Sequence, residues 1–277
     1  DNEYPLLDPE FVRKVVAIVN AGAKIIQIRS HERDRVRELA RAVLGHPEAH
    51  HKFKKACSWC LFHDSFNIIS QKFLKKNRAR TRPIEKLRED IHANQGIWVL
   101  EDYHHLLGQE SDHETRSQAI DFLANMSEFE GNLLILGGKG FDTPQELAKE
   151  ITTLDLPLPD AKILRHIAAT TTELKAKLIS DECIEAARGL TINEARRAFL
   201  KAYQACGDLS GKQAMALISQ AKGQAIRESK LLEYFDTQGC EMADVGGMEN
   251  VKQWLAKRRV GLAPTARALN LDAPKGL

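Results

Sequence analysis

Two adjacent carboxylates, Glu101 and Asp102, have the clearest chemical potential in the sequence, because they end the apolar run Ile97–Leu100. At the end of a buried strand, one carboxylate can hold magnesium through water while the next polarises an attacking water. Their Glu-Asp order reverses the usual Asp-Glu order of such a pair. We interpret the two residues as a relic or a structural pair, with an active magnesium site as the alternative.

The partner that such a pair needs is a phosphate-binding loop, G-x-x-x-x-G-K-[ST], whose glycines let backbone N–H groups approach the phosphates. An earlier strand–turn–helix pattern begins at residue 23 and is the place for this loop. Its turn is Ser30–Asp34, which has no glycine and carries side chains where the phosphates would sit. The first part of the chain is therefore predicted not to bind nucleotide in the usual way.

A second candidate is Cys57-Ser58-Trp59-Cys60, which has the spacing of half a zinc site. His63 is near in sequence and could add a ligand, but the sequence has no second C-x-x-C motif. We favour buried thiols beside a core tryptophan. A zinc site that uses Cys57, Cys60 and His63, or a redox pair, stays open.

Other polar motifs have simpler explanations. His104 and His105 follow the strand that ends in the carboxylates, and they could serve as metal ligands or as a base. We expect them to be exposed or to contact a neighbouring module. The glycine-rich segments 137–140 and 207–213 mimic phosphate loops but lack the required spacing, so they are predicted to be turns.

Segment 72–82 is the densest basic run and could contact nucleic acid or an acidic partner. A solvated linker is the favoured interpretation, because the 40 basic and 38 acidic residues of the chain leave a formal charge of only +2. The candidate contact residues are Lys75, Lys76, Arg78, Arg80 and Arg82.

The composition is that of a soluble globular protein: 43% of the 277 residues are hydrophobic and 28% are charged. No apolar run is long enough to span a bilayer, and the first residues lack a signal-peptide pattern. Five cysteines form no disulfide framework in a chain of this length. We expect a cytoplasmic protein with no membrane partner.

Strands alternate with helices through the first 160 residues, which indicates a mostly parallel sheet covered on both faces. The expected strands are 23–29, 56–62, 97–102, 133–136 and 151–156, and the expected helices are 8–21, 30–44, 83–94 and 112–126. After Pro157–Asp160 only helical patterns occur. They include a capping box at Thr191–Glu194 and a final helix at 212–232.

The end of the chain contains Asp244-Val245-Gly246-Gly247, then an amphipathic helix, then Ala273–Leu277. This arrangement resembles the beginning of the ATPase module of the AAA family. Further matches at Ile97–Leu107, Glu146–Ile151 and Lys230–Glu233 resemble the AAA-like family first described as a conserved plastid reading frame.

The resemblance implies an α/β fold with a three-layer, P-loop-NTPase-like parallel sheet and a small all-helical lid. The expected domains are a degenerate AAA-like core at 1–160 and the lid at 161–235. Residues 236–277 would be a linker and the start of a second AAA module, truncated before its phosphate-binding loop.

By resemblance, Asp244, Val245, Gly246 and Gly247 would lie beside the adenine in the full-length parent, which would use ATP and magnesium. This chain is expected to have no catalytic residue and no cofactor of its own. The implied function is a non-catalytic amino-terminal module of an ATP-dependent remodelling machine. Its partners would be a protein client or adaptor and further copies of itself, through the parent AAA module. The alternative is a nucleic-acid-binding module that uses segment 72–82, with or without structural support from zinc.

Overall fold

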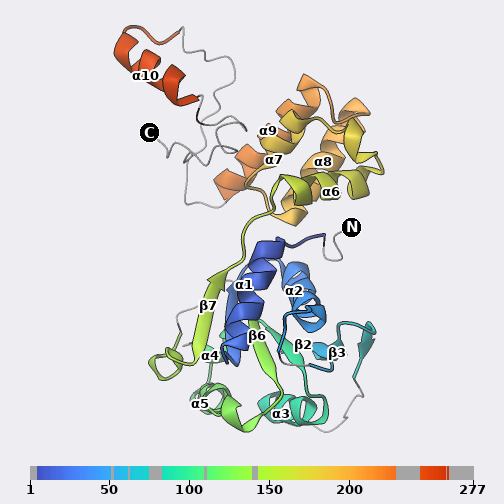
Figure 1. The fold of residues 1–277 in the computed structure, drawn as a ribbon, viewed down its shortest axis with the longest axis vertical. Helices are drawn as coiled ribbons and strands as arrows, with labels where there is room; N and C mark the ends of the chain where they lie inside the picture. The colour runs from blue at the N-terminus through green and yellow to red at the C-terminus, as the bar shows by residue number, and fades with distance from the viewer. Residues whose placement is uncertain are drawn as a thin grey trace.

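The computed structural model describes residues 5–50, 53–61, 63–74, 83–108, 111–138, 143–228, 244–259 and 261. Figure 1 shows a sheet flanked by helices, and a separate group of helices that follows it in the chain. The two parts are joined by an extended segment at residues 156–160. The change from alternating strands and helices to helices alone therefore occurs where the sequence predicts it.

Seven strands in the described part of the chain form one sheet in the order β4-β3-β2-β5-β6-β1-β7. Five neighbouring strands, from β2 to β7 in this order, are parallel, and β3 and β4 add an antiparallel edge. The bounds are β1 Ile25–Arg29, β2 Ala56–Cys60, β3 His63–Asn67, β4 Lys72–Phe73, β5 Ile97–Glu101, β6 Leu133–Gly138 and β7 Ile151–Asp155.

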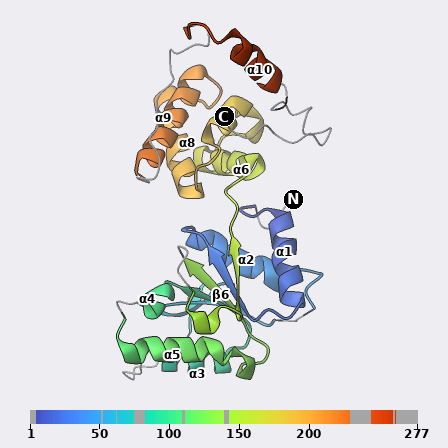
Figure 2. The ribbon, with the colours of Figure 1, turned by 90° about the vertical axis from the view of Figure 1, so that its left-hand side faces the viewer.

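Helices cover both faces of the sheet, because the buried strands are apolar on both sides (Figure 2). One face packs against α1 (Pro9–Asn20) and α2 (Arg33–Gly45) through Ile26, Ile28 and Val99. The other face packs against α3 (Pro83–Ala93), α4 (His104–Leu107) and α5 (His113–Ala124) through Ile25, Trp98 and Leu100. The predicted three-layer fold class is confirmed.

Local signals explain most element boundaries. The Asp8 carboxylate accepts a hydrogen bond from the Glu10 N–H at 3.0 Å, and Pro9 opens α1 as expected. Helix α2 begins at Arg33 and not at Ser30, because the Ser30 hydroxyl accepts from the Glu32 N–H at 3.0 Å and forms a turn.

The β3–β4 hairpin and α4 were not predicted. The hairpin turns at Asn67, whose side-chain oxygen accepts from the N–H groups of Ile69 and Ser70 at 3.0 and 2.9 Å. Two short 3₁₀ turns, η1 (Met126–Glu128) and η2 (Gln145–Leu147), complete the connections around the sheet.

The second part contains α6 (Ala161–Thr172), the 3₁₀ turn η3 (Ala176–Leu178), α7 (Asp181–Ala187), α8 (Ile192–Cys206) and α9 (Lys212–Glu228). Its core includes Leu164, Ile167, Phe199 and Ile218. The predicted capping box at the start of α8 is confirmed, with reciprocal hydrogen bonds between Thr191 and Glu194.

Helix α10 (Glu249–Arg259) follows near the end of the chain and has no buried residue. Its large apolar side chains, Val251 and Trp254, are exposed, and the Arg258 guanidinium lies over the Trp254 ring. Among the described residues, no helix is both long and apolar enough to cross a membrane.

Candidate functional site

The site lies at the carboxyl edge of the parallel strands, which is where ligands bind in open α/β sheets. Glu101 ends β5 and pairs in register with Gly137 of β6, and Arg29 of β1 pairs with Gly138. The strand order therefore brings the carboxylate pair and the turn after β1 to the same edge. The sequence predicted both features but not the side chains that connect them.

Two arginines of α2 neutralise the carboxylate pair. The Arg37 guanidinium donates to both oxygens of Glu101, with Nε–Oε1 and Nη2–Oε2 distances of 2.6 and 3.0 Å. Only 4% of the Glu101 side chain is exposed, so this bidentate pair shields it from solvent. The same hydrogen bond raises the pKa of Arg37 above its ordinary value.

The second carboxylate has its own arginine. Arg33 Nη2 lies 2.5 Å from Asp102 Oδ2, and Arg33 Nη1 lies 3.8 Å from Glu101 Oε2. Two guanidiniums thus match two carboxylates. A magnesium ion at Glu101 would have to displace these hydrogen-bonded cations, which favours the structural interpretation of the pair.

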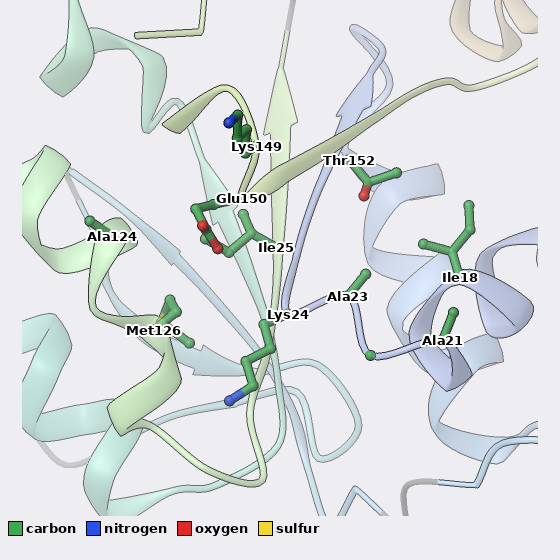
Figure 3. A pocket seen from close by; sticks show the side chains of 11 residues that line it. Ile18, Ala21, Ala23, Lys24, Ile25, Ala124, Met126, Lys149, Glu150 and Thr152 are labelled. Atoms are coloured by element: carbon green, nitrogen blue, oxygen red, sulfur yellow. The ribbon is translucent and has the colours of Figure 1, made fainter. Parts of the chain in front are cut away.

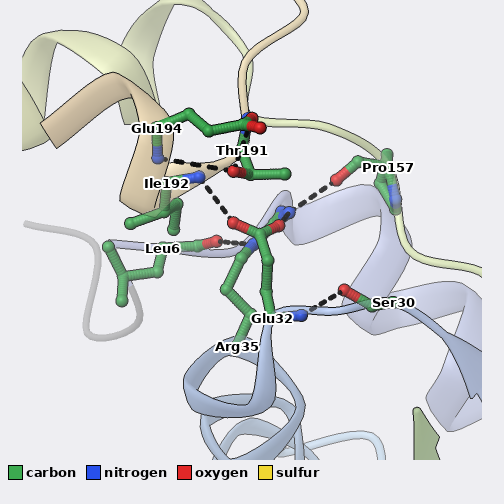
Figure 4. A network of polar contacts seen from close by, with 8 residues as sticks. All are labelled: Leu6, Ser30, Glu32, Arg35, Pro157, Thr191, Ile192 and Glu194. Atoms are coloured by element: carbon green, nitrogen blue, oxygen red, sulfur yellow. Dashed lines mark hydrogen bonds and ion pairs between the residues drawn. The ribbon is translucent and has the colours of Figure 1, made fainter. Parts of the chain in front are cut away.

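The turn after β1 is occupied by a buried ion pair (Figure 4). Arg35 Nη1 donates to Glu32 Oε2 at 2.9 Å, and only 1% and 8% of the two side chains are exposed. Arg35 also donates to the carbonyl oxygens of Leu6 at 2.9 Å and Pro157 at 2.7 Å. This cluster joins the beginning of the described chain, the turn, and the segment that leads to the helical part.

Glu32 also reaches the helical part directly. Its Oε1 accepts from the Ile192 N–H at 2.5 Å, in the first turn of α8 (Figure 4). A helix N-terminus has unsatisfied N–H groups that attract an anion, and here the protein supplies that anion itself. A hollow of about 260 Å³ beside the cluster is lined by residues that include Arg33, Asn193 and Arg196.

A larger hollow, of about 740 Å³, lies at the opposite edge, where β1 and β7 begin. Figure 3 shows Lys24, Met126, Lys149, Glu150 and Thr152 among its lining residues. It is separate from the carboxylate pair, and no motif in the sequence pointed to it.

The structure separates the two cysteines of the C-x-x-C motif. Cys57 belongs to the apolar cluster around Trp98, whereas Cys60 is outside that cluster and lines a hollow with Ser58 and Phe66. Successive residues of a strand point to opposite faces, so the three-residue spacing divides the thiols. Burial raises the pKa of Cys57 to about 11. The side chain of His63 lies outside the description.

Two other sets of predicted residues remain. Lys75, Lys76, Arg78, Arg80 and Arg82 lie outside the described residues. Asp244, Val245, Gly246 and Gly247 precede α10 and are exposed, with Gly247 in a left-handed conformation at φ +68°.

Comparison with known families identifies the fold. Residues 11–156 match the model of the SpoVK-like AAA ATPase N-terminal domain, which is more than half of the chain. The chain belongs to the SpoVK-like AAA ATPase family. Residues 161–229 match the second domain of the same family.

Relatives that match nearly the whole chain carry the name AAA domain-containing protein ycf46. The chain is 26% identical to that of Trieres chinensis over 275 residues, which cover 97% of this chain and 52% of the relative. The protein of Pyropia yezoensis is 23% identical over 96% of this chain and 53% of its own length. The resemblance to the plastid AAA-like family is confirmed, and the chain spans about half the length of these relatives.

A solved structure supports the fold alone. Caenorhabditis elegans PCH-2 superimposes with a TM-score of 0.52 at 9% identity, over 80% of this chain and 71% of that protein. The likeness covers the P-loop-NTPase-like architecture, while the chemistry of the edge has to be read from the residues of this chain.

Proposed function

We propose that this chain is a non-catalytic amino-terminal module of an AAA ATPase, which recognises a protein client or adaptor and supports assembly of a homo-oligomer. ATP and magnesium would act in the ATPase module of the full-length protein. There, Asp244–Gly247 would lie on the adenine side of the nucleotide. Family membership supports the AAA architecture, and the carboxyl edge of the sheet supports the non-catalytic role.

The single observation that carries the proposal is the bidentate pairing of the buried Glu101 carboxylate with Arg37. A hydrolytic site needs carboxylates available to magnesium and water, together with a backbone loop open to phosphate. Here Arg37 holds both oxygens of Glu101, and the Glu32 carboxylate in the turn after β1 accepts a hydrogen bond from the Ile192 N–H at the start of α8.

Nucleotide binding tests the non-catalytic part of the proposal. Magnesium–ATP titrated into the purified chain in a calorimeter should give no saturable heat, and the chain should release no phosphate above a heat-denatured control. A protein that also contains the ATPase module should bind one nucleotide per protomer. Two nucleotides per protomer would show that the first module is a working site.

Assembly is tested at α10, which belongs to the region we assign to the second module. Its exposed Val251 and Trp254 make it a candidate contact between copies. Sedimentation of the full-length protein should show an oligomer that Trp254→Ser weakens, whereas Leu158→Ser, at another exposed apolar residue, should leave it intact. An equal effect of both variants would contradict this assignment.

A further inference from the structure

Three potential metal ligands meet where β5 passes into α4. Asp102, His104 and His105 each offer one ligand atom, and these atoms all lie within 4.8 Å of one another. The two imidazole rings are 4.2 Å apart between centroids. The sequence shows the two histidines and the preceding carboxylate, but adjacency in a sequence does not bring side chains to one point.

Asp102 lies at the corner where β5 ends and the chain turns into α4. Asp102 has φ +57°, a left-handed conformation that aspartate and asparagine adopt more readily than most residues other than glycine. Its carbonyl oxygen accepts from the His105 N–H at 3.0 Å, which closes the corner into α4.

Buried residues fix the junction between β5 and α4. Tyr103 is buried and donates its hydroxyl to the Ala119 carbonyl at 3.0 Å, while Leu106 and Leu107 anchor α4 in the core. Gly138 at the end of β6 leaves space for the His104 imidazole, because a Cβ at position 138 would lie 3.1 Å from His104 Nδ1. The position of the imidazole therefore depends on a glycine of the neighbouring strand.

We propose that Asp102, His104 and His105 form a binding site for a divalent transition-metal ion of the zinc type. Two imidazole nitrogens and one carboxylate oxygen suit Zn²⁺, Co²⁺ or Ni²⁺, whereas magnesium prefers oxygen ligands throughout. Three protein ligands would leave the remaining coordination positions to water. Glu101 takes no part, because Arg37 holds both of its oxygens.

Arg33 competes with the ion for this site. Its guanidinium lies 2.5 Å from one oxygen of Asp102, but 55% of its side chain is exposed, so it can move into solvent. A metal ion and Arg33 repel each other at this distance. Removing the positive charge with Arg33→Gln should therefore tighten metal binding by about tenfold, as Coulomb repulsion across a few ångströms of aqueous surface indicates.

The test is a titration of the metal-free chain with Co²⁺, monitored through the visible absorption bands of the bound ion. Zn²⁺ is then added to compete with the bound Co²⁺. His104→Ala, His105→Ala and Asp102→Asn should each weaken binding by about tenfold or more. Asn tolerates the left-handed conformation, so Asp102→Asn should still fold. His113→Ala is the matched control, because His113 is exposed and lies outside the cluster.

The outcomes distinguish a specific metal site at Asp102, His104 and His105 from nonspecific metal binding to the protein surface. Loss in the three cluster variants, no change in His113→Ala and a gain in Arg33→Gln support the proposal. Absence of saturable binding in the unaltered chain would overturn it. Equal binding by the unaltered chain and the cluster variants, or an Arg33→Gln variant that binds no tighter, would also overturn it.

Discussion

The ion pair of Glu32 and Arg35 provides the sharpest test of how the two parts of the chain are joined. Glu32→Gln keeps the size of the side chain and an oxygen for the Ile192 N–H, but it removes the negative charge next to Arg35. Arg35 would then lose its ion-pair partner at position 32 and keep its contacts with the carbonyl oxygens of Leu6 and Pro157.

The magnitude follows from burial. Removing one partner of a buried ion pair costs about 3–5 kcal/mol, since the remaining charge stays desolvated. The two carbonyl contacts of Arg35 compensate in part, so we expect about 3 kcal/mol of lost unfolding free energy for Glu32→Gln. For a chain of this size, that loss corresponds to a fall in melting temperature of about 6–12 °C.

Thermal unfolding followed by circular dichroism measures this effect, with Asp155→Asn as the control. Asp155 lies 3.8 Å from Arg29 in a pair whose side chains are 80% and 49% exposed. Such a surface pair contributes at most about 1 kcal/mol. If Glu32→Gln destabilises the chain no more than Asp155→Asn, the buried pair does not join the two parts as described.

Three further predictions concern the sheet. Gly96→Ala should lower the free energy of unfolding in urea by about 2–4 kcal/mol, because the new Cβ would lie 2.2 Å from the Lys55 carbonyl oxygen. Gly246→Ala is the control and should lower it far less, because a Cβ at that position meets nothing within 4 Å. Arg37→Gln should lower the free energy of unfolding by about 1.5–3 kcal/mol in the same assay, because Glu101 stays buried without its bidentate cation. An unchanged urea midpoint of unfolding would contradict this. Burial raises the pKa of the Cys57 thiol to about 11, so this thiol is protonated at pH 8. Iodoacetamide at pH 8 should therefore label Cys57 more slowly than the half-buried Cys206, and mass spectrometry of the folded chain measures the two rates.

Local signals in the sequence were enough to predict most elements of the fold. Asp8 and Pro9 mark the start of α1, and the capping box at Thr191–Glu194 marks the start of α8. The apolar run before Glu101 identifies β5. The β3–β4 hairpin was missed because its turn depends on the Asn67 side chain and its strands lack a clear apolar alternation.

The connections within the site could not be predicted, because they join distant parts of the chain. Arg37 and Glu101 are 64 positions apart, and Glu32 and Ile192 are 160 positions apart. Arginines are usually exposed, so nothing local marked Arg35 as a buried residue. The cluster at Asp102 includes one residue in the left-handed conformation, which no pattern of residue types indicates.

Calorimetric titration of magnesium–ATP into the purified 277-residue chain tests the central claim most directly. We predict no saturable binding, because Arg37 holds both oxygens of Glu101 and the turn at Ser30–Asp34 has no glycine that would let the backbone approach phosphate. Stoichiometric binding that Glu101→Gln abolishes would show that the carboxylate pair is a working magnesium site, and would contradict the non-catalytic assignment.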